Sequence, residues 1–272
     1  MSPDRSCLRS VRRIVLKIGT RVLTHDDGSL ALGRLFSIVE ELAAVHRQAR
    51  EVLLVSSGAV GLGREALGVA ATPTDLADRQ AFAAVGQSRL VNLYQQALSH
   101  KNIVVGQILL TQQDFSQAER LRNLRRALGA LLTLRVLPII YENDVVATDE
   151  LVMTPAQQFF GDNDELSALV ATHLGAELLV VLTSVEGIYD KDPRHHPDAS
   201  LLSLVADPGT IQADRQAAEG GRGGMATKLR AACLAQSKGC HVVIAPGRHP
   251  GVLKSVLAGE AIGTWVPAAS VA

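Results

Sequence analysis

Short apolar runs alternate with longer segments of helical spacing along most of the chain. The runs are continuous and rich in Val and Ile, which is typical of strands covered on both faces. Predicted strands cover residues 14–16, 52–55, 103–110, 136–140, 178–182 and 242–245. Predicted helices cover residues 32–48, 76–99, 118–135, 165–174 and 225–237. This alternation predicts an α/β fold, a three-layer α/β/α sandwich with a mainly parallel central sheet.

Two stretches lack this periodicity. Residues 188–210 are rich in Asp, Pro and His, and we expect loops there with a short strand at 201–205. Residues 214–224 are polar and glycine-rich, so we expect this segment to be mobile before a ligand binds. The pair His195 and His196 has no partner at metal-ligand spacing, which favours a solvated loop over a metal site.

Composition narrows the possible functions. Lys plus Arg and Asp plus Glu number 27 each, and aromatic residues make up only 3%, which argues against a nucleic-acid or anionic-membrane surface. Cys7, Cys233 and Cys240 form neither an even disulfide set nor a close metal-binding pair. The sequence has no signal peptide or membrane-spanning apolar run, so we expect a soluble, cytoplasmic protein. We expect no metal site built from protein side chains.

The common phosphate-binding motifs are absent. No G-x-x-x-x-G-K-[ST] occurs, and the glycines from Gly58 to Gly63 are not in the order of the dinucleotide fingerprint. A phosphate site in this chain must therefore be built differently.

Two strand ends on the N-terminal side could hold anions. Lys17, followed by Gly19 and Thr20, could place an ammonium over the edge of the sheet, although a strand-end lysine can also simply face solvent. Ser57 and Gly58 follow the second strand, where small residues let backbone N–H groups approach an anion. The alternative there is a tight turn that needs glycine for backbone reasons.

Polar clusters follow two later elements. Tyr141-Glu142-Asn143-Asp144 ends a strand and could bind an amino group, although loops are also polar because they leave the core. In Gly161-Asp162-Asn163-Asp164-Glu165, Asp162 and Glu165 have capping-box spacing, so a helix cap is the structural alternative. Capping does not explain why Asn163 and Asp164 are also polar, and a functional role is favoured.

The C-terminal half carries two candidate nucleotide segments. Four glycines around Arg222 lead into a helix with Lys228 in its first turn, an unfavourable place for a cation unless an anion binds there. We interpret this segment as a phosphate-binding loop with a second cation, in preference to a plain linker. Thr183 and Ser184 end a strand before Gly187 and Asp190-Lys191-Asp192-Pro193, which could bind a base or ribose.

In this order, the motifs resemble the amino acid kinase family, and within it the bacterial members that phosphorylate glutamate for proline biosynthesis. The resemblance also includes residues 83–90 and 106–111, and it extends over residues 11–266, which we expect to form one amino acid kinase domain. The carboxyl-terminal PUA domain of many bacterial members is not expected in this sequence.

The resemblance implies a role for each matching residue. Lys17 and Lys228 would neutralise the phosphoryl group in flight, and Asp164 would orient them. Ser57, Asp144 and Asn163 would bind the substrate, L-glutamate. The ATP-binding positions would be Lys17, Thr183, Ser184, Arg222, Gly223, Gly224, Met225, Ala226, Thr227 and Lys228. Mg2+ would bridge the ATP phosphates, the product would be an acyl phosphate, and the protein would form a homo-oligomer.

Three positions depart from the pattern of these enzymes. Tyr141 stands where they have Asn near the substrate, Ser184 stands where they have Asp, and Arg222 stands where they commonly have Thr. These departures leave open a kinase of the same fold that acts on a different small acid. A weak regulator that binds ATP or an amino acid is a second alternative, although two lysines and an acid suit phosphoryl transfer better. An RNA-binding role is disfavoured by the charge balance and the few aromatic residues.

Overall fold

The computed structural model describes residues 4–69, 75–147, 163–211 and 224–269 of the chain. In these residues a seven-stranded sheet has the order β3-β4-β2-β1-β5-β6-β7. Six strands are parallel, and β7 pairs antiparallel with β6. The strands are β1 (Arg13–Ile18), β2 (Glu51–Ser56), β3 (Val105–Leu110), β4 (Leu137–Glu142), β5 (Leu178–Thr183), β6 (His241–Pro246) and β7 (Thr264–Val266).

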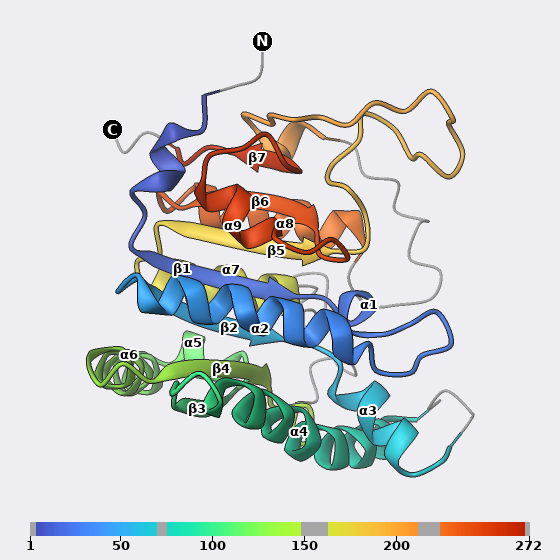
Figure 1. Cartoon of the computed structure of the whole chain (residues 1–272), viewed down its shortest axis with the longest axis vertical. Coiled ribbons are helices and arrows are strands. Elements are labelled where there is room, and N and C mark those ends of the chain that lie inside the picture. The colour runs from blue at the N-terminus through green and yellow to red at the C-terminus, as the bar shows by residue number, and fades with distance from the viewer. Residues whose placement is uncertain (1–3, 70–74, 148–162, 212–223, 270–272) are drawn as a thin grey trace.

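Helices cover both faces of the sheet (Figure 1). One face is covered by α2 (Leu32–Arg47), α4 (Leu76–Ser99) and α9 (Val252–Leu257). The other face is covered by α5 (Gln113–Ser116), α6 (Ala118–Thr133), α7 (Asn163–His173) and α8 (Met225–Gln236). The short helices are η1 (Ser6–Arg9), α1 (Thr20–Leu23), α3 (Ala59–Ala66) and η2 (Pro208–Thr210). The predicted α/β/α sandwich is confirmed.

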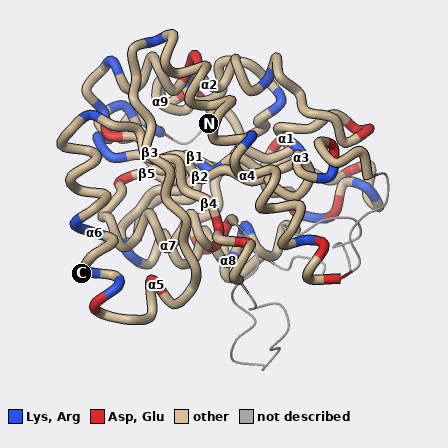
Figure 2. Tube along the Cα trace, turned by 90° about the horizontal axis from the view of Figure 1, so that it is seen from below, with Lys and Arg blue, Asp and Glu red and all other residues tan. Residues whose placement is uncertain are grey.

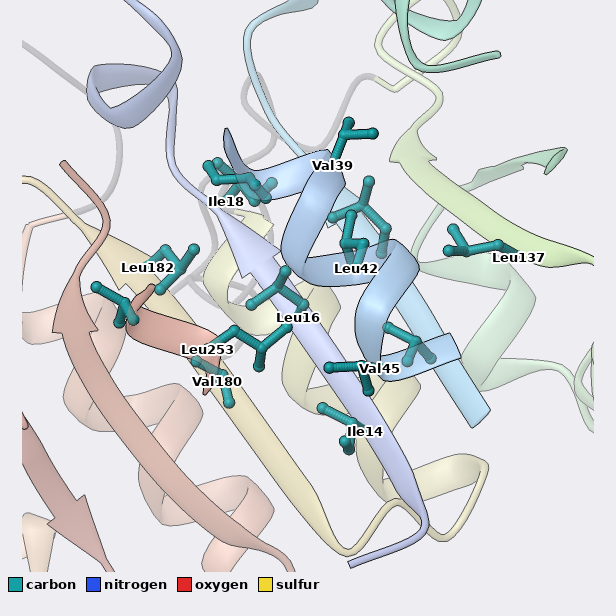
Figure 3. Close-up of a cluster of buried hydrophobic side chains, with 14 of the residues drawn as sticks. Ile14, Leu16, Ile18, Val39, Leu42, Val45, Leu137, Val180, Leu182 and Leu253 are labelled. Atoms are coloured by element: carbon teal, nitrogen blue, oxygen red, sulfur yellow. The ribbon is translucent and has the colours of Figure 1, made fainter. Parts of the chain in front are cut away.

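The two apolar cores follow from strand alternation, since successive side chains point to opposite faces. In β1, Leu16 and Ile18 pack toward α2, whereas Val15 packs toward α7. Figure 3 shows the first core, in which β1 and β5 side chains meet Val39 and Leu42 of α2. Lys17 lies between Leu16 and Ile18, so it points to the α7 side. The core thus sets the direction of the lysine.

Several elements differ from the sequence prediction. The strand predicted at 201–205 is wrong, because Leu201 bridges Tyr189 antiparallel and Leu204 bridges Trp265 parallel, which gives two isolated bridges instead of a ladder. The third strand begins at Val105, not at Ile103, because the N–H of Ile103 donates to the carbonyl of Leu98 and closes a turn. Helix α9 and strand β7 were not predicted, since both are short. Of the segment 214–224, only Gly224 lies within the described residues.

The distribution of charged residues and the character of the helices agree with the amino-acid composition. Figure 2 shows basic and acidic positions interspersed around the trace, in line with a formal net charge of zero. No helix within the described ranges combines the length and the apolar character needed to cross a membrane. The three cysteines are free thiols.

Candidate active site

Two lysines and one aspartate meet at the carboxyl edge of the sheet. The Nζ of Lys17 in β1 lies 2.5 Å from Oδ1 of Asp164, the second residue of α7. The Nζ of Lys228 in α8 donates to Oδ2 of the same carboxylate at 2.9 Å. All three side chains are buried, with Asp164 at 0% exposure. We call Lys17, Asp164 and Lys228 the lysine clamp.

Three separate elements build this clamp. Strand β1 lies between β2 and β5 in the sheet, so Lys17 emerges near its centre. Asp164 lies in the first turn of α7, where the helix dipole favours a negative charge. Lys228 lies in the first turn of α8, where the dipole is unfavourable to a cation, and Asp164 compensates for this. The fold therefore brings the ammonium groups of Lys17 and Lys228 to the carboxylate of Asp164.

The electrostatics of the clamp favour an incoming anion. Burial by itself raises the pKa of Asp164, but the ammonium groups of Lys17 and Lys228 outweigh burial and lower this pKa to about 2. Asp164 is therefore ionised at neutral pH. Two buried ammonium groups that contact the same carboxylate favour an anionic ligand beside them.

Thr227 also contacts the clamp. Its hydroxyl lies 3.1 Å from Oδ2 of Asp164 and 2.8 Å from the carbonyl oxygen of Gly224. The sequence analysis expected Thr227 to bind the nucleotide, and the structure also connects it to Asp164. In the sequence, the only sign of this contact is that Thr227 directly precedes Lys228. The packing of α7 against α8 shows that its partner is Asp164.

The predicted acceptor residues lie at neighbouring strand ends. Ser57 follows β2, is buried, and donates its N–H to the carbonyl of Ile18 at 3.2 Å. Gly58 after it has φ +111°, a left-handed conformation that suits glycine, and it directly precedes the first residue of α3. Asp144 lies in the turn after β4, and Asn163 is the first residue of α7. The Oδ1 of Asn163 is buried with no hydrogen-bond partner among the described residues.

The predicted nucleotide residues lie on the other side of β1. Thr183 ends β5 and is buried, and Ser184 after it is half-buried. Gly224, Met225 and Ala226 lead into α8 and are half-buried. Arg222 and Gly223 lie outside the described residues. Because β5 pairs with β1, Thr183 and Ser184 lie at the same sheet edge as Lys17.

Tyr141 points away from the clamp. It is 2% exposed and belongs to the core on the α2 and α4 side of the sheet, opposite the face that carries Lys17. Its hydroxyl is buried with no hydrogen-bond partner among the described residues. Burial raises the pKa of this hydroxyl, and the neighbouring Tyr94 raises it further. The ring therefore fills the core beneath the acceptor loop.

Two buried polar residues of α4 were not singled out from the sequence. Gln87 donates its Nε2 to the carbonyl of Glu142 at 2.8 Å, and the hydroxyl of Tyr94 lies 3.1 Å from Oγ of Ser56. The two positions are one heptad apart, so they share a face of the helix. Polar groups on an otherwise apolar helix face were the available signal.

The part of the chain that the structure describes contains no cluster of side chains that could bind a metal ion without a ligand. No three His, Cys, Asp or Glu side chains there are grouped so that they could hold a metal ion. Both oxygens of Asp164 face lysine ammonium groups.

The chain belongs to the amino acid kinase family, since the model of that family matches residues 12–246. Three relatives named glutamate 5-kinase cover nearly the whole chain. The enzyme of Pelobacter propionicus is 42% identical over 96% of this chain and 69% of its own length. The enzyme of Trichlorobacter lovleyi is 44% identical over 97% of this chain and 69% of its own length. The enzyme of Symbiobacterium thermophilum is 41% identical over 96% of this chain and 97% of its own length.

Solved structures share the fold. An isopentenyl phosphate kinase superposes with a TM-score of 0.63 at 20% identity, covering 94% of this chain and all of the other. The UMP kinase of Bacillus anthracis gives a TM-score of 0.62 at 17% identity, covering 96% of this chain and 97% of the other. At these identities the likeness concerns the architecture alone.

Proposed function

We propose that this chain is an ATP-dependent kinase that phosphorylates the γ-carboxylate of L-glutamate to L-glutamyl 5-phosphate, the first step of proline biosynthesis. The observation that carries the proposal is the buried clamp of Lys17, Asp164 and Lys228 at the carboxyl edge of the sheet. Relatives named glutamate 5-kinase at 41–44% identity support the choice of glutamate.

The chemistry needs charge stabilisation more than proton transfer. A glutamate carboxylate is already ionised at neutral pH, so it can attack the γ-phosphorus without a general base. A new bond forms between a carboxylate oxygen and phosphorus, the bond to the β,γ-bridging oxygen breaks, and ADP leaves. Lys17 and Lys228 offset the charge of the phosphoryl group during transfer, while Asp164 holds both ammonium groups in place.

The two substrates would approach from opposite sides of Lys17. Ser57, Asp144 and Asn163 would bind glutamate at the ends of β2, β4 and the start of α7. Thr183, Ser184 and the segment from Arg222 to Lys228 would bind ATP. The Oδ1 of Asn163, which is buried and has no hydrogen-bond partner within the described residues, would accept a hydrogen bond from the amino group of glutamate. Mg2+ would enter on the ATP phosphates and neutralise part of their charge.

Hydroxylamine trapping of the acyl phosphate tests the proposal. Purified protein is incubated with Mg2+ and ATP and with glutamate, aspartate, N-acetylglutamate or a phosphorylated small molecule in turn. Hydroxamate formation with glutamate above the other acids supports the assignment. Preference for another acid would indicate a different kinase of this family. ATP binding without turnover of any acid would indicate a regulator.

Other parts of the proposal rest on the resemblance. We propose that residues 11–266 act as one amino acid kinase domain, that the protein works as a homo-oligomer, and that it resides in the cytoplasm. Light scattering of the purified protein tests the oligomeric state.

A further inference from the structure

Helix α4 contacts both loops that would bind the acceptor. Gln87 lies in the middle of α4 and is 5% exposed, an unusual degree of burial for an amide side chain. Its Nε2 donates to the carbonyl oxygen of Glu142 at 2.8 Å. Glu142 ends β4, and Asn143 and Asp144 follow directly. The amide thus binds the last peptide group before the predicted acceptor turn.

The backbone geometry shows how this carbonyl comes to face α4. The N–H of Asn143 donates to Leu110 of β3 at 2.8 Å. In a trans peptide the carbonyl points opposite to the N–H, so the carbonyl of Glu142 points away from β3 and toward β2. The ladder between β2 and β4 ends at Val55 and Ile140, two residues before Glu142. Beyond the end of that ladder, Gln87 supplies a buried donor to the carbonyl, and buried backbone carbonyls are stabilised by such hydrogen bonds.

The preceding residue of α4 contacts the other acceptor loop. A Cβ on Gly86 would lie 1.7 Å from the carbonyl oxygen of Ala59, so the two backbones are in direct contact. Ala59 is the first residue of α3 and follows Ser57 and Gly58. One heptad after Gln87, the hydroxyl of Tyr94 lies 3.1 Å from Oγ of Ser56, behind the same turn.

Adjacent residues of one helix therefore fix the two turns relative to each other. We propose that Gln87 is a positioning residue for the acceptor, which holds the turn with Asp144 in register with the turn at Ser57. Gly86 and Tyr94 hold the Ser57 side of the same pocket. This inference rests on the proposed function only in taking Ser57 and Asp144 as the acceptor side. The nucleotide side, at Thr183 and α8, makes no such contact with Gln87 in the described residues.

The test compares Gln87→Met with Gln95→Met. Met is close to Gln in length but has no donor, and Gln95 is an exposed glutamine on the solvent face of the same helix. For Gln87→Met we expect the glutamate KM to rise roughly tenfold, which corresponds to about 1.4 kcal/mol, while the ATP KM stays within about twofold. Gln95→Met should change neither constant.

A second variant, Tyr94→Phe, keeps the test decisive if Gln87→Met does not fold. Tyr94→Phe keeps the ring in the core and removes only the hydroxyl, and its glutamate KM should rise about threefold with the ATP KM unchanged. The inference is overturned if neither variant changes the glutamate KM, or if both KM values rise together. If the substrate panel identifies another acid, the KM of that acid is compared. If no acid turns over, dissociation constants from calorimetry replace the KM values, so failure of the glutamate assignment does not decide this test.

Discussion

The ammonium of Lys17 and the carboxylate of Asp164 lie 2.5 Å apart, although they come from the first strand and from a helix in the second half of the chain. The approach is possible because β1 lies next to β5 and because Lys17 points to the face that α7 covers. A buried ion pair of this kind contributes little net stability, since desolvation offsets the attraction. Under the proposed function, this pair would hold Lys17 in position for an anionic ligand.

Removing either clamp lysine should lower kcat far more than it weakens ATP binding. The charge of the transferring group is developed most strongly in the transition state, so Lys17→Ala and Lys228→Ala should each reduce kcat roughly 10²–10³-fold. Steady-state kinetics and ATP titration measure the two effects separately. Lys254→Ala, at an exposed position of α9, is the matched control and should retain full activity. Near-normal kcat with only a raised ATP KM would contradict the clamp assignment.

Acid should destabilise the wild-type protein through Asp164. Its pKa is lowered to about 2 in the folded state, from an ordinary value of 3.8, after the two lysines outweigh burial. A lowered folded-state pKa contributes stability that is present above pH 3.8 and is lost as the pH falls toward 2, on the order of 2 kcal/mol.

Thermal unfolding between pH 5 and pH 2 checks this expectation. Asp164→Asn cannot titrate at this position, so the component due to Asp164 should be absent from its pH profile. The variant should also be less stable at neutral pH, because two buried ammonium groups then lack their carboxylate. Identical slopes for the two proteins would show that Asp164 does not dominate the acid transition.

Tyr141→Phe should leave both stability and glutamate KM nearly unchanged, or raise stability slightly. The hydroxyl of Tyr141 is buried with no partner in the described residues, so its removal relieves a desolvation cost. Tyr141→Asn should instead lower the free energy of unfolding by about 3 kcal/mol or more, because it empties core volume. Urea denaturation and acceptor kinetics distinguish the two. A clear rise in glutamate KM for the Phe variant would place the hydroxyl at the substrate.

Gly86→Ala and Gly129→Ala form a matched pair of helix substitutions. At Gly86 the new Cβ would lie 1.7 Å from the carbonyl oxygen of Ala59, so α3 and α4 must separate, at a cost of about 3 kcal/mol or more. At Gly129 in α6 a Cβ meets nothing within 4 Å, and the change should stabilise the protein by about 1 kcal/mol. Melting temperatures compare the two. Equal effects would mean that the close approach of α3 and α4 does not constrain the fold.

The sequence by itself determined the fold class and most of the clamp. Continuous Val and Ile runs separated by amphipathic segments predicted the parallel sheet, since this pattern depends only on local periodicity. Local patterns marked Lys17 at a strand end and Asp164 and Lys228 at helix starts as candidates, the resemblance implied their joint role, and the structure places their side chains in contact. Short elements such as β7 were missed, because three residues carry too little periodicity to be recognised.

Only the tertiary structure decided which polar residues meet. The pairing of Gln87 with the carbonyl of Glu142, and of Thr227 with Asp164, depends on helices that are distant in sequence from their partners. The direction of Tyr141 was likewise undecided, because a strand position reveals its face only once the neighbouring helices are placed. Local patterns fix the period of each element, whereas side-chain partners depend on how the elements pack.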